Sequence, residues 1–308
     1  MSQPPQPVAP QFQPVHIGEL SDPPDAVLPD PATLFSARAA RLRKLTSDHQ
    51  LAPYLTFIAD IADAQQRIVT ALPIAKLPPH DELDRALEHG MAPIARARVE
   101  IGATVLTTLD RLLEETRHLA MPEAAAASRD GDIAADDTER RAMIANVRAD
   151  SLPVEEIAEH VFVAAALQVH FARLAALLPA DKIKSVSDGA CPACGGPPAT
   201  SSVVDWMNSQ SARFCCCGTC ATKWHVVRVK CVACSSTKGI HYLHVEGVAD
   251  SIKAECCDEC RTYLKIFYTD KDPNFDPIAD DLASAGLDLM VREKGFRRGG
   301  FNVFLAGF

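Results

Sequence analysis

Hydrophobic residues recur at helical spacing through the first half of the chain, from Pro31 to about residue 181. In the segment 51–72, Leu55, Ile58 and Ile61 fall on one face of a helix because they are three residues apart. The other segments with this pattern are 31–45, 80–90, 96–119, 136–147 and 153–178. Together they predict a bundle of about five to seven helices.

Polar residues interrupt this pattern at 127–137, an acidic stretch that we predict to be a solvated connection. The short segment 80–90 ends in Gly90, a residue that favours the left-handed conformation at a helix terminus. His160 and His170 fall on the last long helix, but their spacing of ten residues does not place them one turn apart. We therefore interpret both as core or surface histidines rather than ligands.

The pattern changes again after Pro179. Segments 223–230 and 261–269 combine β-branched and aromatic residues, which favour strands, and each directly follows a CxxC pair. Helical spacing returns after the last cysteine and predicts one helix over 276–293. The apolar tail, with Phe301, Phe304 and Phe308, is expected either to pack on the body or to face a partner.

All eleven cysteines lie between residues 191 and 260, and four CxxC pairs among them form two equal modules. In each module, 22 residues separate the two pairs. A CxxC turn places two thiolates where both can reach one tetrahedral ion at about 2.3 Å, and two such turns complete the shell. The predicted metal sites are Cys191, Cys194, Cys217 and Cys220 in the first module, and Cys231, Cys234, Cys257 and Cys260 in the second.

The spacing does not exclude an interleaved arrangement, in which the pairs of one module bind across to the other. Three further cysteines, Cys215, Cys216 and Cys256, are surplus to the two shells. They are either interior side chains or redox-active thiols beside a metal. The nearby His225, His241 and His244 are not predicted as ligands, since four thiolates already complete each shell.

Each module has the order of a zinc ribbon or rubredoxin-like unit, and four thiolates accept either zinc or iron. A structural metal would contribute folding free energy on the order of 10 kcal/mol to such a small module. Glycine after the second cysteine of a pair lets backbone N–H groups approach sulfur, as in rubredoxin-type iron sites. Only Gly195 meets this condition, while Ala221, Ser235 and Arg261 stand at the equivalent positions.

Composition narrows the classes of function. The net charge is −9, and residues 191–270 hold eight Lys and Arg against seven Asp and Glu, so no basic surface for nucleic acid is expected. The N-terminus lacks the basic start and apolar stretch of a secretory signal. The longest apolar run, 161–178, contains Gln168, His170 and Arg173, which argues against membrane insertion. We expect a cytoplasmic protein, where clustered cysteines bind metal rather than form disulfides.

The sequence contains no Gly-rich phosphate loop after a strand and no compact set of nucleophile, base and orienting acid, so the protein is not predicted to be an enzyme. The predicted fold class is α+β: an N-terminal all-α helical bundle, two tandem rubredoxin-like or zinc-ribbon modules, and a C-terminal helix. The expected domains are a Pro-rich arm (1–30), a helical domain (31–183), the first module (184–230), the second module (231–270), and a C-terminal helix with its tail (271–308).

Five stretches from Cys191 onward together resemble the formate dehydrogenase accessory protein family, FdhE. They are "CPACGGPP", "CATKWHVVRVKCVAC", "TKGIHYL", "AECCDECRTYLKIFYTDKDPNFDPIADDLAS" and "GFRRGGFNVFL". The resemblance implies a chaperone-like maturation factor that binds the catalytic subunit of respiratory formate dehydrogenase in the cytoplasm before export. It also implies iron at the eight predicted cysteines, with zinc as the alternative. The run "FCCC" is richer in cysteine than the family pattern and leaves the roles of Cys215 and Cys216 open.

Two other interpretations stay open on the sequence. One is a redox or electron-transfer component that acts through the metal sites, and the other is a structural zinc-ribbon interaction module. The sequence also leaves open which surface a client would contact and whether the protein forms a homodimer.

Overall fold

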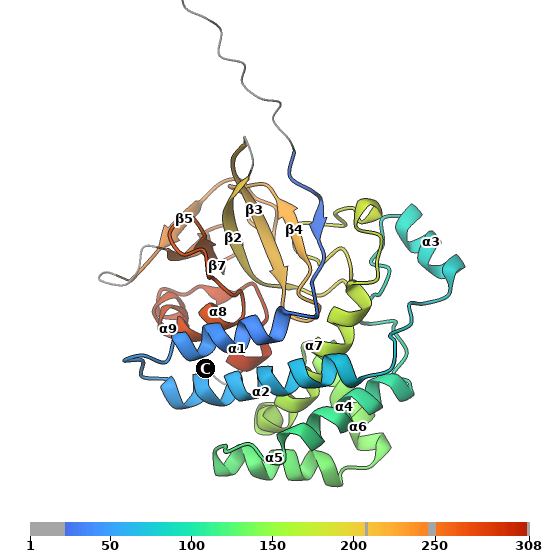
Figure 1. Ribbon diagram of the computed structural model, residues 1–308. Helices are drawn as coiled ribbons and strands as arrows, with labels where there is room; N and C mark the ends of the chain where they lie inside the picture. The colour runs from blue at the N-terminus through green and yellow to red at the C-terminus, as the bar shows by residue number, and fades with distance from the viewer. Residues whose placement is uncertain (1–21, 207–208, 246–250, 307–308) are drawn as a thin grey trace, which may run out of the picture.

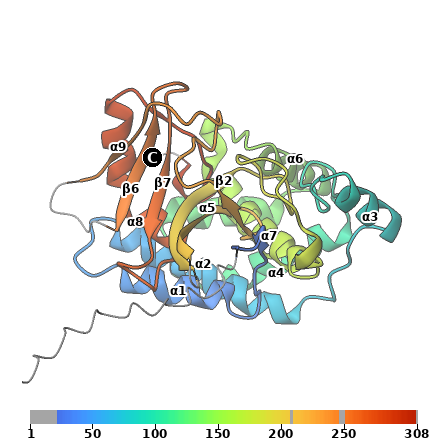
Figure 2. The ribbon, with the colours of Figure 1, turned by 90° about the horizontal axis from the view of Figure 1, so that it is seen from above.

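A computed structural model describes residues 22–206, 209–245 and 251–306. Its helices form a layer beneath a curved sheet, and the short helix α3 projects to one side (Figure 1). The view from above places α9 beside β6 and β7, with α3 at the opposite end of the molecule (Figure 2). The molecule is therefore a helical domain joined to a sheet domain, as the α+β class predicts.

The helical domain is built around its last and most buried helix. This helix, α7 (Ile157–Ala175), is apolar on nearly all sides because it packs against α2, α4, α5 and α6. Seven α-helices lie between residues 31 and 183, within the predicted range. The other six are α1 (Leu34–Lys44), α2 (Ala52–Ala71), α3 (His80–Glu88), α4 (Ala103–Thr116), α5 (Glu123–Ala134) and α6 (Asp137–Arg148), and the 3₁₀ turns η1 (Val154–Glu156) and η2 (Ala180–Lys182) flank α7.

One sheet runs through both cysteine modules in the order β1-β4-β3-β2-β7-β6-β5, with β8 paired to β7. Its first half contains β1 (Ala26–Val27), β2 (Pro198–Trp206), β3 (Ser209–Cys217) and β4 (Lys223–Val226). The second half contains β5 (Ile240–Leu243), β6 (Ile252–Cys257), β7 (Thr262–Tyr268) and β8 (Arg297–Arg298). The halves meet where β2 and β7 pair in parallel, with Ser201 opposite Ile266. This pairing makes the two modules one continuous layer.

Buried ion pairs hold distant elements together. Arg213 on β3 is fully buried and donates to Glu255 Oε1 on β6 at 2.8 Å, which links the two modules. Arg41 on α1 donates to Asp280 Oδ2 at 2.9 Å, and Arg38 donates to Asp276 Oδ1 at 3.3 Å. The contacts of Arg38 and Arg41 join α1, the first helix of the helical domain, to the segment that follows the sheet.

The C-terminal segment differs from the single helix expected over 276–293. It forms α8 (Ala279–Ala283) and α9 (Ala285–Glu293), which are separated at Ser284 with φ −98° and ψ 25°. The Ser284 side chain and carbonyl accept hydrogen bonds from Lys265 Nζ, both at 3.0 Å. The break therefore supplies acceptors for a buried lysine. After α9, the turn η3 (Val303–Leu305) buries Phe304, Phe301 is half-buried, and Phe308 lies outside the described residues.

Three other predictions of local structure were wrong. Most of the expected loop 127–137 is helical, because α5 extends to Ala134 and a capping box of Asp136 and Glu139 starts α6 two residues later. The helix expected over 96–119 begins only at Ala103, since the backbone before it pairs with the first CxxC turn. The strand expected over 223–230 ends at Val226.

Most of the expected Pro-rich arm, residues 1–21, lies outside the described residues. The part that follows contributes β1, where Ala26 pairs with Trp224 of β4. Among the helices that the structure describes, none combines the length and the hydropathy needed to cross a bilayer.

Candidate metal centres

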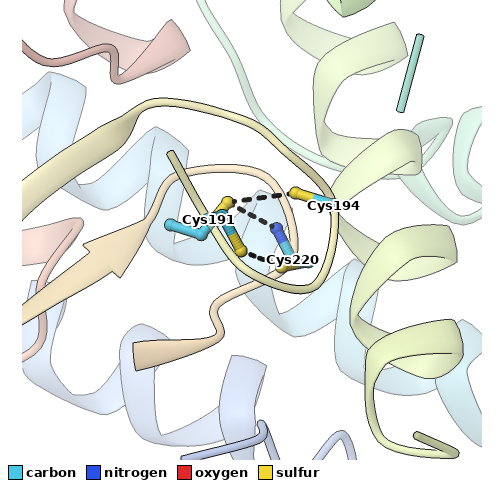
Figure 3. A group of neighbouring side chains, drawn as sticks. Cys191, Cys194 and Cys220 are labelled. Atoms are coloured by element: carbon cyan, nitrogen blue, oxygen red, sulfur yellow. Dashed lines mark hydrogen bonds between the residues drawn. The ribbon is translucent and has the colours of Figure 1, made fainter. Parts of the chain in front are cut away.

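The first four-cysteine group joins the turn before β2 to the turn after β3. The sulfur atoms of Cys191 and Cys220 lie 3.5 Å apart, and those of Cys194 and Cys217 lie 3.4 Å apart. Figure 3 shows the labelled sulfurs of Cys191, Cys194 and Cys220 converging on one point. All four side chains are at most 1% exposed and belong to the main hydrophobic core. The first site is therefore closed to solvent.

The helical domain provides much of this enclosure. The amide of Ile94 donates to the Ala193 carbonyl at 3.0 Å, and the amide of Arg96 donates to the Cys194 carbonyl at 2.8 Å. On the other side, Gln168 of α7 donates to the Gly218 carbonyl at 2.9 Å. Both CxxC turns of the first site are thus held by hydrogen bonds from the helical half, the first from backbone amides and the second from the Gln168 side chain.

The second four-cysteine group has the same plan at the other half of the sheet. The sulfurs of Cys231 and Cys260 lie 3.6 Å apart, and those of Cys234 and Cys257 lie 3.7 Å apart. Here Cys234 is exposed and Cys260 is partly exposed. The second site therefore faces solvent on one side, and the two sites are not interleaved.

Each group fits a single tetrahedral metal ion. In a tetrahedral shell with bonds of about 2.3 Å, neighbouring sulfurs are roughly 3.8 Å apart. The four sulfurs of each group lie within 4.8 Å of one another, and the closest pairs are slightly nearer than that ideal. Four thiolates on one tetrahedron favour zinc or iron over oxygen-seeking cations.

The electrostatics of the first site also fit a cation. Burial raises the pKa of Cys191 and Cys220 well above that of a free thiol, because a thiolate loses its hydration there. In contrast, hydrogen bonds from the neighbouring thiols lower the pKa of Cys217 despite its burial. The protein alone thus favours the thiolate of Cys217, and a bound metal ion would hold Cys191 and Cys220 in the same form.

All four CxxC turns share one backbone conformation, which the glycine pattern did not reveal. The residue after the second cysteine has positive φ in each turn: Gly195 (74°), Ala221 (60°), Ser235 (61°) and Arg261 (55°). Each of these amides donates to the carbonyl of the first cysteine in its pair, at 2.8 to 3.2 Å. The rubredoxin-type turn therefore forms with three non-glycine residues in the left-handed region.

Two threonines at equivalent positions also contact the sulfurs, and sequence reasoning missed them. Thr222 Oγ1 lies 3.2 Å from Cys220 Sγ, and Thr262 Oγ1 lies 2.9 Å from Cys260 Sγ. A hydroxyl at this distance can donate to a thiolate. Although burial opposes ionisation, hydrogen bonds that include those from Thr262 lower the pKa of Cys260 to about 7. A threonine two residues after the last cysteine of each four-cysteine group was the available signal.

A third missed residue, Arg96, lies beside the first site. Its guanidinium pairs with Asp150, and Nη1 donates to Asp150 Oδ1 at 2.7 Å. Burial opposes its charge, but Asp150 and the thiolates of Cys194 and Cys217 outweigh burial and raise its pKa. Arg96 therefore supplies positive charge next to a site of four thiolates, and only its place in the fold shows this.

The three surplus cysteines and the nearby histidines lie outside both four-sulfur groups in the part of the chain that is described. Cys215, Cys216 and Cys256 are at most 5% exposed, and burial raises the pKa of each to about 12. These thiols fill the interior of the sheet domain. The ring of His225 packs on Phe214, that of His241 packs on Phe296, and His244 is exposed.

The fold and the two sites define a class of protein in which a helical domain carries two zinc-ribbon-like four-cysteine modules. Family models described as FdhE, N-terminal, FdhE, central domain, and FdhE, C-terminal domain match residues 23–188, 190–228 and 229–305. The chain belongs to the FdhE family, the formate dehydrogenase accessory proteins.

Individual relatives match over nearly the whole chain. The FdhE homolog of Rhizobium meliloti is 42% identical over 97% of this chain and 98% of its own length. The FdhE protein of Salmonella enteritidis is 33% identical over 92% of this chain and 91% of its own. The crystal structure of the FdhE protein from Pseudomonas aeruginosa superposes with a TM-score of 0.81 at 32% identity, covering 92% of this chain and 99% of that one.

Proposed function

We propose that this protein is a non-catalytic maturation factor that binds the catalytic subunit of a formate dehydrogenase in the cytoplasm, before export of that subunit. The observation that carries the proposal is the match to FdhE proteins across all three parts of the chain, at up to 42% identity among the relatives described above. The rigid sheet supports this role, because Arg213 and the pairing of β2 with β7 fix the two modules to each other. Such a platform presents one preorganised surface to a client.

We further propose that each four-cysteine group binds one iron ion in a rubredoxin-like site. Support comes from the four turns with positive φ and from the amides of Thr219 and Cys220, each 3.4 Å from Cys217 Sγ. Amide hydrogen bonds to sulfur tune the potential of such sites. Bound iron would supply one-electron chemistry. At the first site, the buried cysteine turns would exclude water from the ion.

Metal content and the visible spectrum of protein purified without oxygen test the iron assignment. About two irons per chain with thiolate-to-iron absorption supports it. About two zincs and a colourless sample overturns it and leaves the modules as structural zinc ribbons. A reversible spectral change on reduction would favour the second candidate function, a redox component, for which the geometry of the turns is the supporting observation.

The client interaction is tested by capture of the formate dehydrogenase catalytic subunit with tagged protein. The Cys217→Ser/Cys220→Ser variant is expected to lose capture, because it removes two of four ligands from the buried first site. Cys216→Ala is the matched control, since Cys216 is buried next to Cys217 but lies outside the four-sulfur group. Capture at the wild-type level by a folded double variant would show that the first site is not needed for binding the client.

A further inference from the structure

A cavity of about 680 Å³ opens in the helical domain, and none of the described cysteines lines it. It lies between α3, the backbone at 91–100, the start of α4 and the side of α7. Its size is in the range of small-molecule binding sites. Its apolar surface includes Leu77, Val105 and Leu174, of which the last two are at most 4% exposed.

A buried histidine without hydrogen-bond partners lines this cavity. His170 is 5% exposed, and neither of its ring nitrogens has a partner among the described residues. Burial, with the charges of Arg173 and Arg148, lowers the His170 pKa to about 4, so the ring is neutral. It therefore offers one N–H donor and one acceptor nitrogen to whatever occupies the cavity.

A second histidine on the same helix shows how unusual this is. His160 is fully buried, yet its Nδ1 lies 2.6 Å from the Glu156 carbonyl and its Nε2 lies 3.3 Å from Asn146 Nδ2. Buried polar atoms are nearly always paired, because leaving them unpaired costs their full hydration free energy. The unpaired nitrogens of His170 thus point to a ligand that supplies the missing partners.

The start of α4 adds a positive end to the same cavity. Gly102, Thr104 and Val105 line it, and α4 is fourteen residues long. Gly102 is the N-cap, and within the described chain no side chain accepts a hydrogen bond from the first turn. Free N–H groups and the helix dipole at this point favour an anionic oxygen.

The rim carries charges of both signs. Lys76, Arg85 and Arg98 supply positive charge around the opening, and Asp81, Glu82 and Glu100 supply negative charge. Asp81 and Glu82 lie in the first turn of α3, where they complement the dipole of that helix, and Asp81 lies 3.6 Å from Arg85. The free positive end of α4 is therefore the site in the cavity best suited to an anion.

We propose that this cavity binds a carboxylate carried on an apolar group, with the carboxylate at the first turn of α4 and His170 and the apolar group against Val105 and Leu174. The carboxylate belongs either to a free organic acid or to the C-terminus of a peptide. The proposal does not depend on the metal sites or on the client described above.

Two probes separate the sources of the carboxylate. Titration of the metal-loaded protein with 3-phenylpropionate, and with acetyl-Ala-Ala-Phe as free acid and as amide, is followed by calorimetry and by the ¹³C signal of the His170 ring. If 3-phenylpropionate binds more tightly than the peptide acid, the cavity is a small-molecule site. If the peptide acid binds more tightly than 3-phenylpropionate, the cavity binds a chain end. Equal binding of peptide acid and amide overturns the proposal unless 3-phenylpropionate binds more tightly than both. No shift of the His170 signal at millimolar concentrations of either probe also overturns it.

Two variants test the residues that define the site. His170→Phe keeps a ring of similar size but removes both nitrogens, so it should weaken binding roughly tenfold or more while raising Tm. Thr104→Glu places a carboxylate at the first turn of α4, where it should compete with the ligand and leave the fold intact. His160→Phe is the control, expected to lower Tm and leave binding unchanged in the protein that remains folded. Unchanged binding in both His170→Phe and Thr104→Glu contradicts the proposed site.

Discussion

Three residues in the metal-site turns hold a backbone conformation that glycine adopts more easily. Ala221, Ser235 and Arg261 have φ between 55° and 61°. The left-handed region costs a non-glycine residue roughly 1–2 kcal/mol. Arg261 recovers part of this cost, because its guanidinium stacks 3.9 Å from the Phe296 ring and donates to the Lys294 carbonyl. For Ala221, no comparable side-chain contact is available to a methyl group.

Ala221→Gly should therefore stabilise the protein by roughly 0.5–1 kcal/mol, which is the relieved backbone cost less the greater freedom of glycine in the unfolded chain. Urea denaturation of the metal-loaded protein measures the change. Gly195→Ala, at the equivalent turn, should destabilise by a similar amount, because φ is 74° there. The added Cβ would make only an ordinary contact with Ala92, so no steric clash contributes. A destabilising Ala221→Gly together with a stabilising Gly195→Ala would refute the conformational argument.

A buried carboxyl on α5 makes stability depend on pH. Asp132 is 1% exposed, and neither carboxylate oxygen has a hydrogen-bond partner among the described residues. Burial and the charge of Glu159, opposed by that of Arg140, raise the pKa of Asp132 from 3.8 to about 8. The native state thus binds a proton that the unfolded state releases between these two values. The resulting stabilisation is complete below about pH 4 and is lost as the pH rises through about 8.

Asp132→Asn should remove this dependence, because the amide does not titrate. The free energy of unfolding of the wild type should fall relative to the variant between pH 5 and 8, by on the order of 1–3 kcal/mol. Urea denaturation at both pH values gives the difference. Parallel pH profiles for the two proteins would mean that Asp132 titrates normally in the folded state.

At the scale of elements, one buried lysine joins the second module to the C-terminal helices. Lys265 on β7 is fully buried, with its Nζ 2.5 Å from Asp288 Oδ2 and 3.2 Å from Asp281 Oδ1. Arg298 pairs with the same two aspartates at 2.6 and 2.7 Å. Two acids and two bases therefore balance each other between the sheet and the pair α8 and α9. Removing one base leaves two buried acids with a single cation, so one negative charge is uncompensated.

Lys265→Met is accordingly expected to destabilise the protein by about 3–5 kcal/mol, although it adds apolar surface to the core. Thermal and urea unfolding of the purified variant provide the measurement. The control is Lys182→Met on the exposed turn η2, expected to change stability by less than about 0.5 kcal/mol. A Lys265→Met protein as stable as the wild type would show that the network is replaceable by apolar packing.

At the scale of the whole molecule, the two four-cysteine sites have equal geometry but unequal exposure. The first is enclosed by the helical domain, whereas Cys234 and Cys260 of the second reach solvent. A competing chelator must reach the metal through the protein surface, so exposure decides the rate of release. The two sites of the proposed metal-loaded protein should therefore differ in lability, not in ligand set.

A chelator should remove one metal per chain in a fast phase and the other in a slow phase. Cys234→Ser should accelerate the fast phase only, and Cys194→Ser, at the corresponding position of the first site, should affect only the slow phase. Metal release is followed with a chromogenic chelator. Release of both metals in one phase would contradict the link between burial and lability.

The sequence predicted the features that repeat locally along the chain. The equal spacing of the CxxC pairs grouped the eight cysteines as the structure brings them together, and their role as ligands stays a prediction. Helical spacing gave the helical domain because the periodicity of its apolar face is local. The prediction of a loop at 127–137 was wrong, because acidic residues and Gly131 obscure the helical pattern there. The helix begins before this segment, with Pro122 as its N-cap.

Features that depend on distant contacts could not be predicted. The parallel pairing of β2 with β7 joins strands separated by a whole module, and nothing near Ser201 or Ile266 indicates it. The break at Ser284 likewise follows from Lys265 on another element. The left-handed turns at Ala221 and Arg261 arise because the paired cysteines impose the conformation against local preference.

The ion pair between Arg41 of α1 and Asp280 of α8 can form only late in synthesis. Arg41 and Asp280 are 239 residues apart in the chain. A ribosome that adds about 5–20 residues per second needs roughly 10–50 s to pass from one to the other. Throughout that interval, α1 emerges without the acids that neutralise Arg38 and Arg41 in the folded protein. Any partner that recognises the surface formed by α1 and α8 therefore meets only chains that have been translated beyond residue 280.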